Sequence, residues 1–410
     1  MRFSVSRTLP LIGLLGFFSG LPLALTASTL TAWLADAGVD RASIGLFAAI
    51  ATPYAFKFLW SPLIDGVRLP LLHRLGRRRS WLLLTQLLLA GAIALMAGNS
   101  PAENQWLTAL FGLMVSTLSA TQDIVIDAYR VERLAPEEQG SGAAWATFGY
   151  RMGMLVSGAG ALYLADRMDW HATYLAMAGL MASSVLVTLL AREPRAVVTV
   201  AQAHGMASFL REYVVAPFRD FMTRPHWLAV LAFVVLYKLG DAFMGIMFNP
   251  FLLDLGFEKS QIAAVVKVYG LIATLLGTFA GGWMVGRVGM FRTLLVCGFA
   301  HMLTNFLLVA QAEIGADVHF LALSVSLENF TGGMSSAAFI AYLAALCRVN
   351  YTATQYALLS SLAAFGRTWL STPSGLLSAT VGWAWFFAIA SLMAVPGLVL
   401  LVWLERRKLH

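Results

Sequence analysis

Residues 226–252 read HWLAVLAFVVLYKLGDAFMGIMFNPFL, an apolar run whose only formal charges are Lys238 and Asp241 near its middle. An α-helix rises about 1.5 Å per residue, so about 20 residues cross a hydrocarbon core roughly 30 Å thick. The run is longer than this, and we predict that it forms a membrane-spanning helix. Its two central charges need a specific reason to be there, because charged groups are costly in hydrocarbon.

The rest of the chain repeats this apolar pattern. Apolar residues make up 59% of the 410 residues and charged residues only 12%, whereas soluble chains carry about a quarter charged residues. The sequence therefore predicts an all-α membrane protein with twelve transmembrane helices. The first run resembles a signal peptide, but it is too long and lacks an A-x-A cleavage site, so we expect it to be retained. The twelve runs lie at residues 9–34, 43–63, 80–98, 105–129, 140–165, 170–191, 226–252, 260–286, 292–312, 319–347, 353–381 and 383–404.

Basic residues are distributed unevenly between the two sets of loops. With both termini on one side of the membrane, the loops on that side hold 20 of the 28 Lys and Arg residues. The opposite loops hold three, Arg41, Arg167 and Lys259. Short basic loops stay in the cytoplasm, so we expect both termini to be cytoplasmic. Contact with anionic lipid then accounts for the net charge of +7, and nucleic acid is not expected as a partner.

Several classes of function lack the sequence motifs that they need. The two cysteines, Cys297 and Cys347, lie in separate apolar runs, and the sequence has no C-x-x-C or Cys/His cluster. We find no P-loop of the form G-x-x-x-x-G-K-[ST] and no nucleophile paired with a base. We therefore predict a protein that is not an enzyme and uses no cofactor or metal.

Two halves of the chain share motifs at matching places. Gln139 precedes Arg151 by twelve residues in the fifth run, and Gln355 precedes Arg367 by the same interval in the eleventh. The loops after the second and eighth runs both contain glycine and arginine, as GRRR and GRVGMFR. We predict the major facilitator architecture of two pseudo-symmetric six-helix bundles. The expected parts are an N-terminal bundle at 1–191, a cytoplasmic linker at 192–225 and a C-terminal bundle at 226–410.

Several stretches resemble the AmpG muropeptide permeases of the major facilitator superfamily. They are YAFKFLWSPLID (54–65), GRRRSWLLLTQ (76–86), SATQDIVIDAY (119–129), GYRMGMLVSG (149–158), VLYKLGDAF (235–243), ENFTGGM (328–334) and ATQYALLSSLAAFGR (353–367). The loop after the second run departs from the usual superfamily pattern, with Ser61 in place of the first Gly and an inserted RLPLLHRL. The chain also ends after twelve runs, as expected for a short family member.

This resemblance implies a function. The family imports anhydromuropeptides, the GlcNAc-anhydroMurNAc-peptide fragments of cell-wall recycling, through the bacterial inner membrane with the proton gradient. We therefore expect an anhydromuropeptide and protons as partners of a protein that works as a monomer in the lipid bilayer. Siderophore permeases share parts of the pattern, so a siderophore or other amphiphilic anion is an alternative substrate. A membrane sensor that binds muropeptides without transporting them is an alternative from another class.

Nine charged residues lie inside the predicted helices. Each costs about 2.5 to 3.5 kcal/mol at a helix centre, so together they would exceed a stability of about 5 to 15 kcal/mol if they faced lipid. They must face protein, one another or a water-filled cavity. They are Lys57, Asp123, Asp127, Arg151, Lys238, Asp241, Lys267, Glu328 and Arg367.

Polar stripes on the fourth and tenth runs indicate where the acids point. Ser116, Ser119, Asp123 and Asp127 follow helical spacing, and so do Ser324, Glu328, Thr331 and Ser335. We expect the stripes to line a cavity, with Asp123, Asp241 and Glu328 as the candidates for proton coupling. The alternative is that the hydroxyl residues only allow helices to pack closely.

Depth along each run suggests ion pairs. Lys57 and Asp123 lie at similar depths, as do Lys267 and Glu328, so we predict these two pairs. Asp127 is a further ion-pair or gate candidate. Lys238 and Asp241 are three residues apart and can neutralise one another. Each pair has a purely structural alternative. In the functional interpretation, protonation of the acid breaks the pair and moves a gate.

The remaining candidates concern substrate and gate. Arg151 and Arg367 suit bidentate binding of a carboxylate, with a tie between helices as the alternative. Tyr150 and Tyr237 could stack on sugar rings, although most membrane aromatics serve packing. Asp65, Arg77 and Arg78 resemble the inner gate latch of the superfamily, and simple positive-inside topology is the alternative. His301 is interpreted as a satisfied core histidine rather than a proton relay.

Overall fold

The computed structural model describes residues 8–70, 72–194 and 206–408, and within these ranges it is helical with no β-strand. It forms two compact units. Unit 1 comprises Met1–Leu134, Trp145–Pro217 and Cys347–Ala357, and unit 2 comprises Ala135–Ala144, Phe218–Leu346 and Leu358–His410. Each unit thus includes a short segment from the other half of the chain. The predicted division around a linker at 192–225 stays a prediction.

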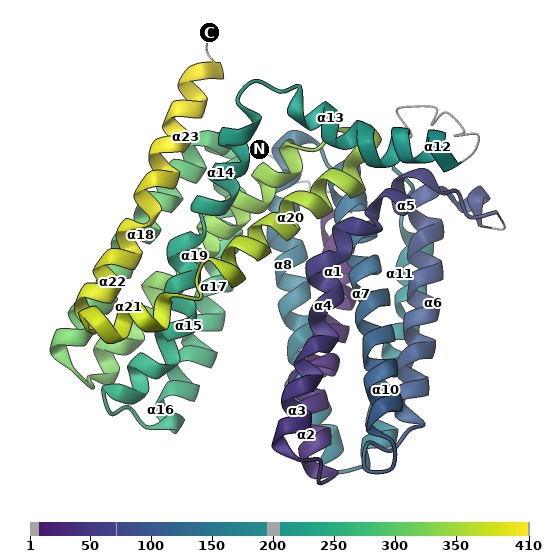
Figure 1. The fold of residues 1–410 in the computed structure, drawn as a ribbon, viewed down its shortest axis with the longest axis horizontal. Coiled ribbons are helices and arrows are strands. Elements are labelled where there is room, and N and C mark those ends of the chain that lie inside the picture. Colours follow the sequence, from purple (N-terminus) through teal and green to yellow (C-terminus); the bar gives the residue numbers. More distant parts are fainter. Residues whose placement is uncertain (1–7, 71, 195–205, 409–410) are drawn as a thin grey trace. The chain divides into compact units, whose positions relative to one another are not determined.

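The helices of unit 1 are α1 (Thr8–Thr26), α2 (Ser28–Asp36), α3 (Arg41–Leu46), η1 (Phe47–Ala51), α4 (Thr52–Phe56), η2 (Lys57–Leu59), α5 (Ser61–Gly66), η3 (His73–Leu75), α6 (Arg77–Ala97), α7 (Gln105–Arg133), most of α8 (Gln139–Leu155), η5 (Val156–Gly160), α9 (Ala161–Ala165), α10 (Trp170–Ala182), α11 (Ser184–Leu190), α12 (Met206–Phe209), η6 (Leu210–Val215), the start of α13 (Ala216–Met222), η8 (Val349–Tyr351) and the start of α20 (Thr352–Trp369). In Figure 1 most helices of unit 1 are purple or blue, while α12 and α13 are teal and α20 is yellow-green.

Unit 2 contains the remaining helices. They are η4 (Pro136–Glu138), the start of α8, the rest of α13, α14 (Trp227–Leu236), α15 (Leu239–Asp254), α16 (Lys259–Ile262), η7 (Ala263–Tyr269), α17 (Gly270–Val288), α18 (Met290–Ile314), α19 (Val318–Ala345), the rest of α20, α21 (Ser374–Val381), α22 (Trp383–Leu392) and α23 (Ala394–Lys408).

All twelve predicted runs fall in helical segments, but they differ in continuity. Eight are long and apolar enough to cross a membrane as they stand, and α19 with α20 counts as a ninth, bent by 99°. The run at 43–63 is divided into five short pieces, and Pro53 and Pro62 enter first turns there, where a missing backbone N–H costs little. The run at 140–165 contains a π-helical turn at η5.

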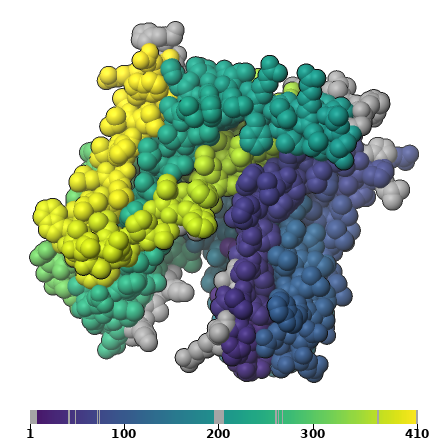
Figure 2. Space-filling model, viewed as in Figure 1, coloured from purple at the N-terminus to yellow at the C-terminus, as the bar shows by residue number. Residues whose placement is uncertain are grey.

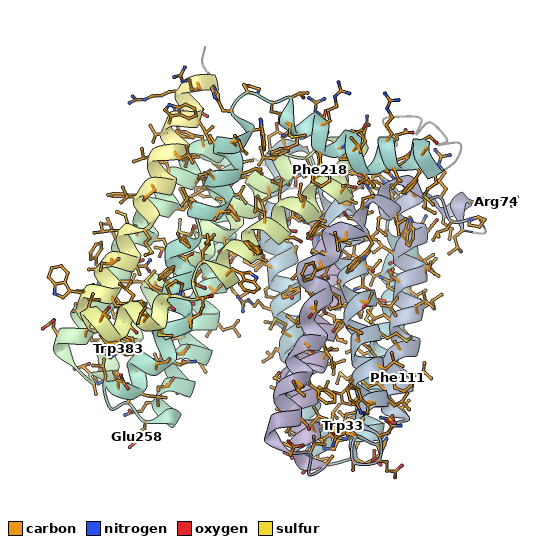
Figure 3. The ribbon with its side chains drawn as sticks, in the orientation of Figure 1. Trp33, Arg74, Phe111, Phe218, Glu258 and Trp383 are labelled. Atoms are coloured by element: carbon orange, nitrogen blue, oxygen red, sulfur yellow. The ribbon has the colours of Figure 1, made fainter. Side chains whose placement is uncertain are left out.

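A repeated contact relates the two units. In unit 1, Trp170 at the start of α10 donates its indole N–H to Asp36 at the end of α2, at 2.8 Å. In unit 2, Trp383 at the start of α22 donates to Asp254 at the end of α15, at 3.2 Å. Figure 3 labels Trp383 near Glu258, at the end of unit 2 opposite Phe218. Corresponding helices therefore meet in the same way in each unit.

Glycines allow the closest helix contacts in unit 1. A Cβ on Gly149 of α8 would lie 1.8 Å from the carbonyl oxygen of Gly13 on α1. One on Gly153 would lie 2.1 Å from the carbonyl oxygen of Phe17. These helices touch backbone to backbone, as small residues permit in membrane proteins.

Candidate functional site

The seventh predicted run is broken at the charged pair. Helix α14 ends at Leu236, and α15 starts at Leu239. Lys238 has φ −112° and ψ 6°, outside helical geometry, and Asp241 lies in the first turn of α15. An acid in the first turn is favoured by the exposed N–H groups of a helix. The sequence indicated a continuous helix here. The pair instead lies at the junction of α14 and α15.

Lys238 is held by one carboxylate and two hydroxyls. Its Nζ donates to Asp241 Oδ2 at 2.9 Å, which confirms the pair as an interaction. It also donates to Ser336 Oγ at 3.1 Å and Ser335 Oγ at 3.4 Å, both on α19. The side chains of Lys238 and Asp241 remain 17% and 30% exposed. The pair is therefore not fully enclosed by protein.

His301, which the sequence indicated as a satisfied core histidine rather than a proton relay, contacts the central acid. Its Nε2 lies 2.9 Å from Asp241 Oδ1, so the carboxylate has a cationic or hydrogen-bonding partner on each oxygen. Its Nδ1 lies 3.1 Å from Thr331 Oγ1, and Thr331 contacts Thr304 at 2.7 Å. The histidine is satisfied, as predicted, but by the central acid. A Cβ on Gly332 would come within 2.9 Å of the imidazole, so the Gly332–Gly333 pair was a sequence signal for a close neighbour.

Tyr237 supports the pair instead of offering an open ring. Its ring stacks on Phe339 with centroids 5.4 Å apart, and only 6% of the residue is exposed. Its hydroxyl donates to the carbonyl oxygen of Leu294 at 3.0 Å and accepts from Ser335 at 3.1 Å. The predicted role in sugar stacking does not fit this burial. Tyr237 instead holds Ser335, one of the partners of Lys238.

Glu328 lies on α19, the helix that supplies the serines. It accepts a hydrogen bond from Asn329 at 2.8 Å, and Asn329 accepts one from Thr274 of α17 at 3.0 Å. The side chain of Lys267, its predicted partner, lies outside the described part of the structure. That pair therefore stays a prediction.

Unit 1 has its own acidic cluster on α7. Ser19 of α1 donates to Asp123 at 2.5 Å. Lys57 lies 4.0 Å from Asp127, and Arg130 lies 3.8 Å from the other oxygen of Asp127. The predicted pair of Lys57 with Asp123 is thus wrong by one helical turn. Depth along a run cannot resolve positions one turn apart, and Ser19 already occupies Asp123.

The polar stripes are largely buried. Ser116, Ser119 and Ser324 are 0% exposed, and Ser335 is 2% exposed. Ser335 and Thr331 nevertheless contact Lys238 and His301, and the acids are the partly exposed members, so the choice between cavity lining and packing stays a prediction.

Of the residues predicted to bind a substrate carboxylate, the structure describes the side chain of Arg151 but not that of Arg367. Arg151 on α8 is exposed and makes no ion pair within the described residues. Tyr150, beside it, is partly buried. The side chain of Arg367 on α20 lies outside the described part, so its role stays a prediction.

The residues of the predicted gate latch, Asp65, Arg77 and Arg78, lie together in unit 1. Asp65, at the end of α5, is fully buried and bonds Arg78 at 2.7 Å. The same carboxylate accepts from the backbone N–H and the hydroxyl of Thr354, each at 2.8 Å. Thr354 lies in the first turn of α20, so Asp65 caps that helix. The sequence predicted Asp65 and the arginines but not this partner.

Two further acids complete the latch. Glu132 of α7 accepts from Arg77 at 3.1 Å and also bonds Arg78. Glu193 accepts from the backbone N–H of Arg78 at 2.8 Å. In unit 2, the corresponding end of α17 meets α8 through Gly282 and Gly140, where an added Cβ would lie 2.5 to 2.6 Å from a carbonyl oxygen. The two units therefore use different chemistry at matching places.

Comparison with known proteins extends these observations. The model of the Major Facilitator Superfamily matches residues 12–369. The anhydromuropeptide permease of Escherichia coli K12 is 42% identical over 392 residues, which cover 95% of this chain and 78% of that permease. A protein of Rickettsia felis named as transporter AmpG 4 is 37% identical over 400 residues, covering 97% of this chain and 96% of that protein.

Solved structures agree on the fold. The E. coli fucose:proton symporter FucP superposes with a TM-score of 0.71 at 15% identity, covering 97% of this chain and 98% of that chain. FucP in the outward conformation gives 0.70 at 14% identity over the same shares. At such identities the likeness shows the fold alone, which is the predicted all-α membrane fold.

Proposed function

This chain belongs to the major facilitator superfamily and to its anhydromuropeptide permeases, and from that membership we propose that it imports anhydromuropeptides together with protons. The chain is a multi-pass membrane transporter and not an enzyme. The finer proposal is that it works by alternating access as a monomer in the bacterial inner membrane, with both termini in the cytoplasm.

The main observation in favour of proton coupling is that both carboxylate oxygens of Asp241 have a partner. One carboxylate oxygen is bonded by Lys238 and the other by His301, and both partners come from outside the first turn of α15. A carboxylate with two such partners is stable without a proton. If one partner leaves, the carboxylate becomes an undercompensated buried charge and can take a proton instead.

A carboxylate on the substrate could draw Lys238 away from Asp241. Anhydromuropeptides carry peptide carboxylates, and an ammonium on a flexible stem can turn from Asp241 to such a group. Proton binding and substrate binding would then favour each other, and this linkage must be reciprocal. His301 would keep Asp241 in position during the exchange. Arg151, exposed in unit 1, is a second candidate for the substrate carboxylate.

The latch supplies a gate for the same cycle. Asp65 holds the first turn of α20, while the later residues of that helix belong to unit 2. A buried cap of this kind must be released for the start of α20 to move. We propose that its release accompanies opening toward the cytoplasm.

Uptake in proteoliposomes tests the function directly. Purified protein with an imposed inward proton gradient should concentrate radiolabelled GlcNAc-anhydroMurNAc-peptide, and a protonophore should abolish the concentration. Excess unlabelled ferric siderophore should leave uptake unchanged. Displacement by the siderophore would instead favour the amphiphilic anion permease. Binding without any uptake would favour the sensor.

A further inference from the structure

A cavity separate from the Lys238 cluster opens at one end of unit 2. Its volume is about 530 Å³, within the range of roughly 300 to 1,000 Å³ that is usual for small-molecule sites. It lies where residues 224–226 enter α14, and α18, α19 and α23 provide the other walls. Figure 2 shows the yellow surface of α23 beside the teal surface of α14 at this end. Neither Lys238, Asp241 nor His301 lines it.

The interior of the cavity is mainly apolar. Leu294 of α18 and Leu401 of α23 line it and are 0% and 3% exposed. Tyr342 of α19 also lines it, with its ring against Phe233 at a centroid distance of 5.0 Å. The Tyr342 hydroxyl makes no hydrogen bond with any residue that the structure describes. One polar atom is thus left available in an apolar wall.

Charged and polar groups line the rim of the cavity. Arg224, His226 and Arg407 line it, together with one acid, Glu405. Arg224 pairs with Asp220 at 3.9 Å and donates to the carbonyl oxygen of Leu346 at 2.5 Å. Arg407 packs over the ring of Trp403 at 5.3 Å and forms no ion pair with a described carboxylate. The guanidinium of Arg407 is therefore exposed at the rim.

The backbone at the rim is unusual. His226 has φ 58°, and no other non-glycine residue in the described ranges has a positive φ. Strained backbone of this kind concentrates at functional sites. The residue also turns the chain into α14, and its ring contacts Trp403 at a centroid distance of 4.8 Å. The strain is therefore located where the cavity opens.

We propose that this cavity binds one anionic phospholipid of the inner leaflet. Arg407 and Arg224 would bind the phosphate, because guanidinium groups suit phosphate oxygens. The Tyr342 hydroxyl would reach the ester region, and the apolar interior would hold the start of an acyl chain. Basic pockets between membrane helices on the cytoplasmic side bind such head groups. A soluble phosphate would fill only the rim and leave the apolar walls uncovered.

The site is independent of the transported substrate but contacts the transport helices. Val230, on the first half of the broken span, lines the cavity. Leu294 lines it too, and its carbonyl oxygen accepts the hydroxyl of Tyr237. A bound lipid would thus fix the ends of helices that lead to Lys238.

The experiment measures lipid retention on the full chain. Native mass spectrometry of the purified protein titrated with dioleoylphosphatidylglycerol gives its affinity, with dioleoylphosphatidylcholine as the zwitterionic reference. We expect Arg407→Ala and Arg224→Ala each to weaken phosphatidylglycerol binding by about tenfold or more, as loss of a charge-assisted contact does. Tyr342→Phe should weaken it less. The matched control is Arg406→Ala, which removes the same charge from an exposed neighbour that does not line the cavity.

Two results would overturn the proposal. An equal loss in Arg406→Ala would show general attraction to a basic surface. Displacement of the lipid by millimolar inorganic phosphate would show a soluble-anion site. Failure of muropeptide uptake in proteoliposomes would count against the proposed transport function only, since lipid retention is measured without substrate.

Discussion

Asp65 accepts two hydrogen bonds from Thr354, a residue 289 positions further along the chain, while it holds the buried guanidinium of Arg78. One carboxylate therefore links an ion pair to the start of a helix. Loss of its charge weakens both interactions at once, because a neutral amide neither compensates Arg78 nor interacts as strongly with the helix N–H groups.

The first prediction follows for Asp65→Asn. The transport rate should fall by about tenfold or more, which corresponds to about 1.4 kcal/mol or more, while substrate affinity changes little. Glu132 still compensates Arg78, so the protein should fold. Initial uptake rates and calorimetric binding separate the two quantities. Glu103→Gln, in an exposed loop, is the control. Equal rate and affinity in Asp65→Asn would contradict the gate and leave Asp65 with a structural role only.

Asp241→Asn tests the coupling site. An amide can accept from Lys238 or His301 but cannot cycle a proton, so accumulation driven by an imposed proton gradient should be lost. Exchange of labelled for unlabelled substrate should continue. Both are measured on one preparation in proteoliposomes. A variant that still concentrates substrate would transfer the coupling role to Asp123 or Glu328.

His301 is tested by comparing two replacements. Gln can keep a hydrogen bond to Asp241 but never carries a charge. Leu can form no such hydrogen bond. We expect His301→Gln to transport with a nearly unchanged KM but a flatter dependence of rate on pH between about 5.5 and 8, where histidine titrates. His301→Leu should lose most activity. An unchanged pH profile in His301→Gln would reduce the histidine to a packing role.

The corrected ion pair in unit 1 can be measured by a double-mutant cycle. Lys57→Ala and Asp127→Asn should show a coupling energy on the order of 0.5 to 3 kcal/mol in thermal or denaturant unfolding. The cycle of Lys57→Ala with Asp123→Asn should give a smaller value, since Ser19 is the partner of Asp123. A larger coupling energy for Lys57 with Asp123 than for Lys57 with Asp127 would support the pair predicted from the sequence.

Glycine substitutions test the helix contacts. Gly149→Ala would place a methyl 1.8 Å from a carbonyl oxygen on α1, so α1 and α8 must separate, and we expect a lower Tm. Gly179→Ala is the matched control, because nothing lies within 4 Å of its added Cβ on α10. That change should stabilise the helix by up to about 1 kcal/mol. Similar Tm shifts in the two variants would contradict the close contact.

The sequence predicts the helical runs well, because long apolar runs have few alternatives in a membrane. It also predicts the Lys238–Asp241 pair, since three residues on one helix bring the groups together. It does not predict the break at Tyr237 and Lys238, where no proline marks the end of α14. The sequence does not give Asp241 as the partner of His301, because this contact joins residues 60 positions apart on two helices, and spacing within one run carries no such information.

The exchange of segments between the units has a consequence for biosynthesis. Residues 347–357 complete unit 1, yet they follow most of unit 2 along the chain. At roughly 5 to 20 residues per second, the ribosome needs on the order of 10 to 40 s after Leu134 to reach them. During that interval the carboxylate of Asp65 has no Thr354 to hold. The newly inserted N-terminal half must therefore persist in the bilayer as an incomplete assembly, open to insertases and to quality-control proteases, until the eleventh span emerges.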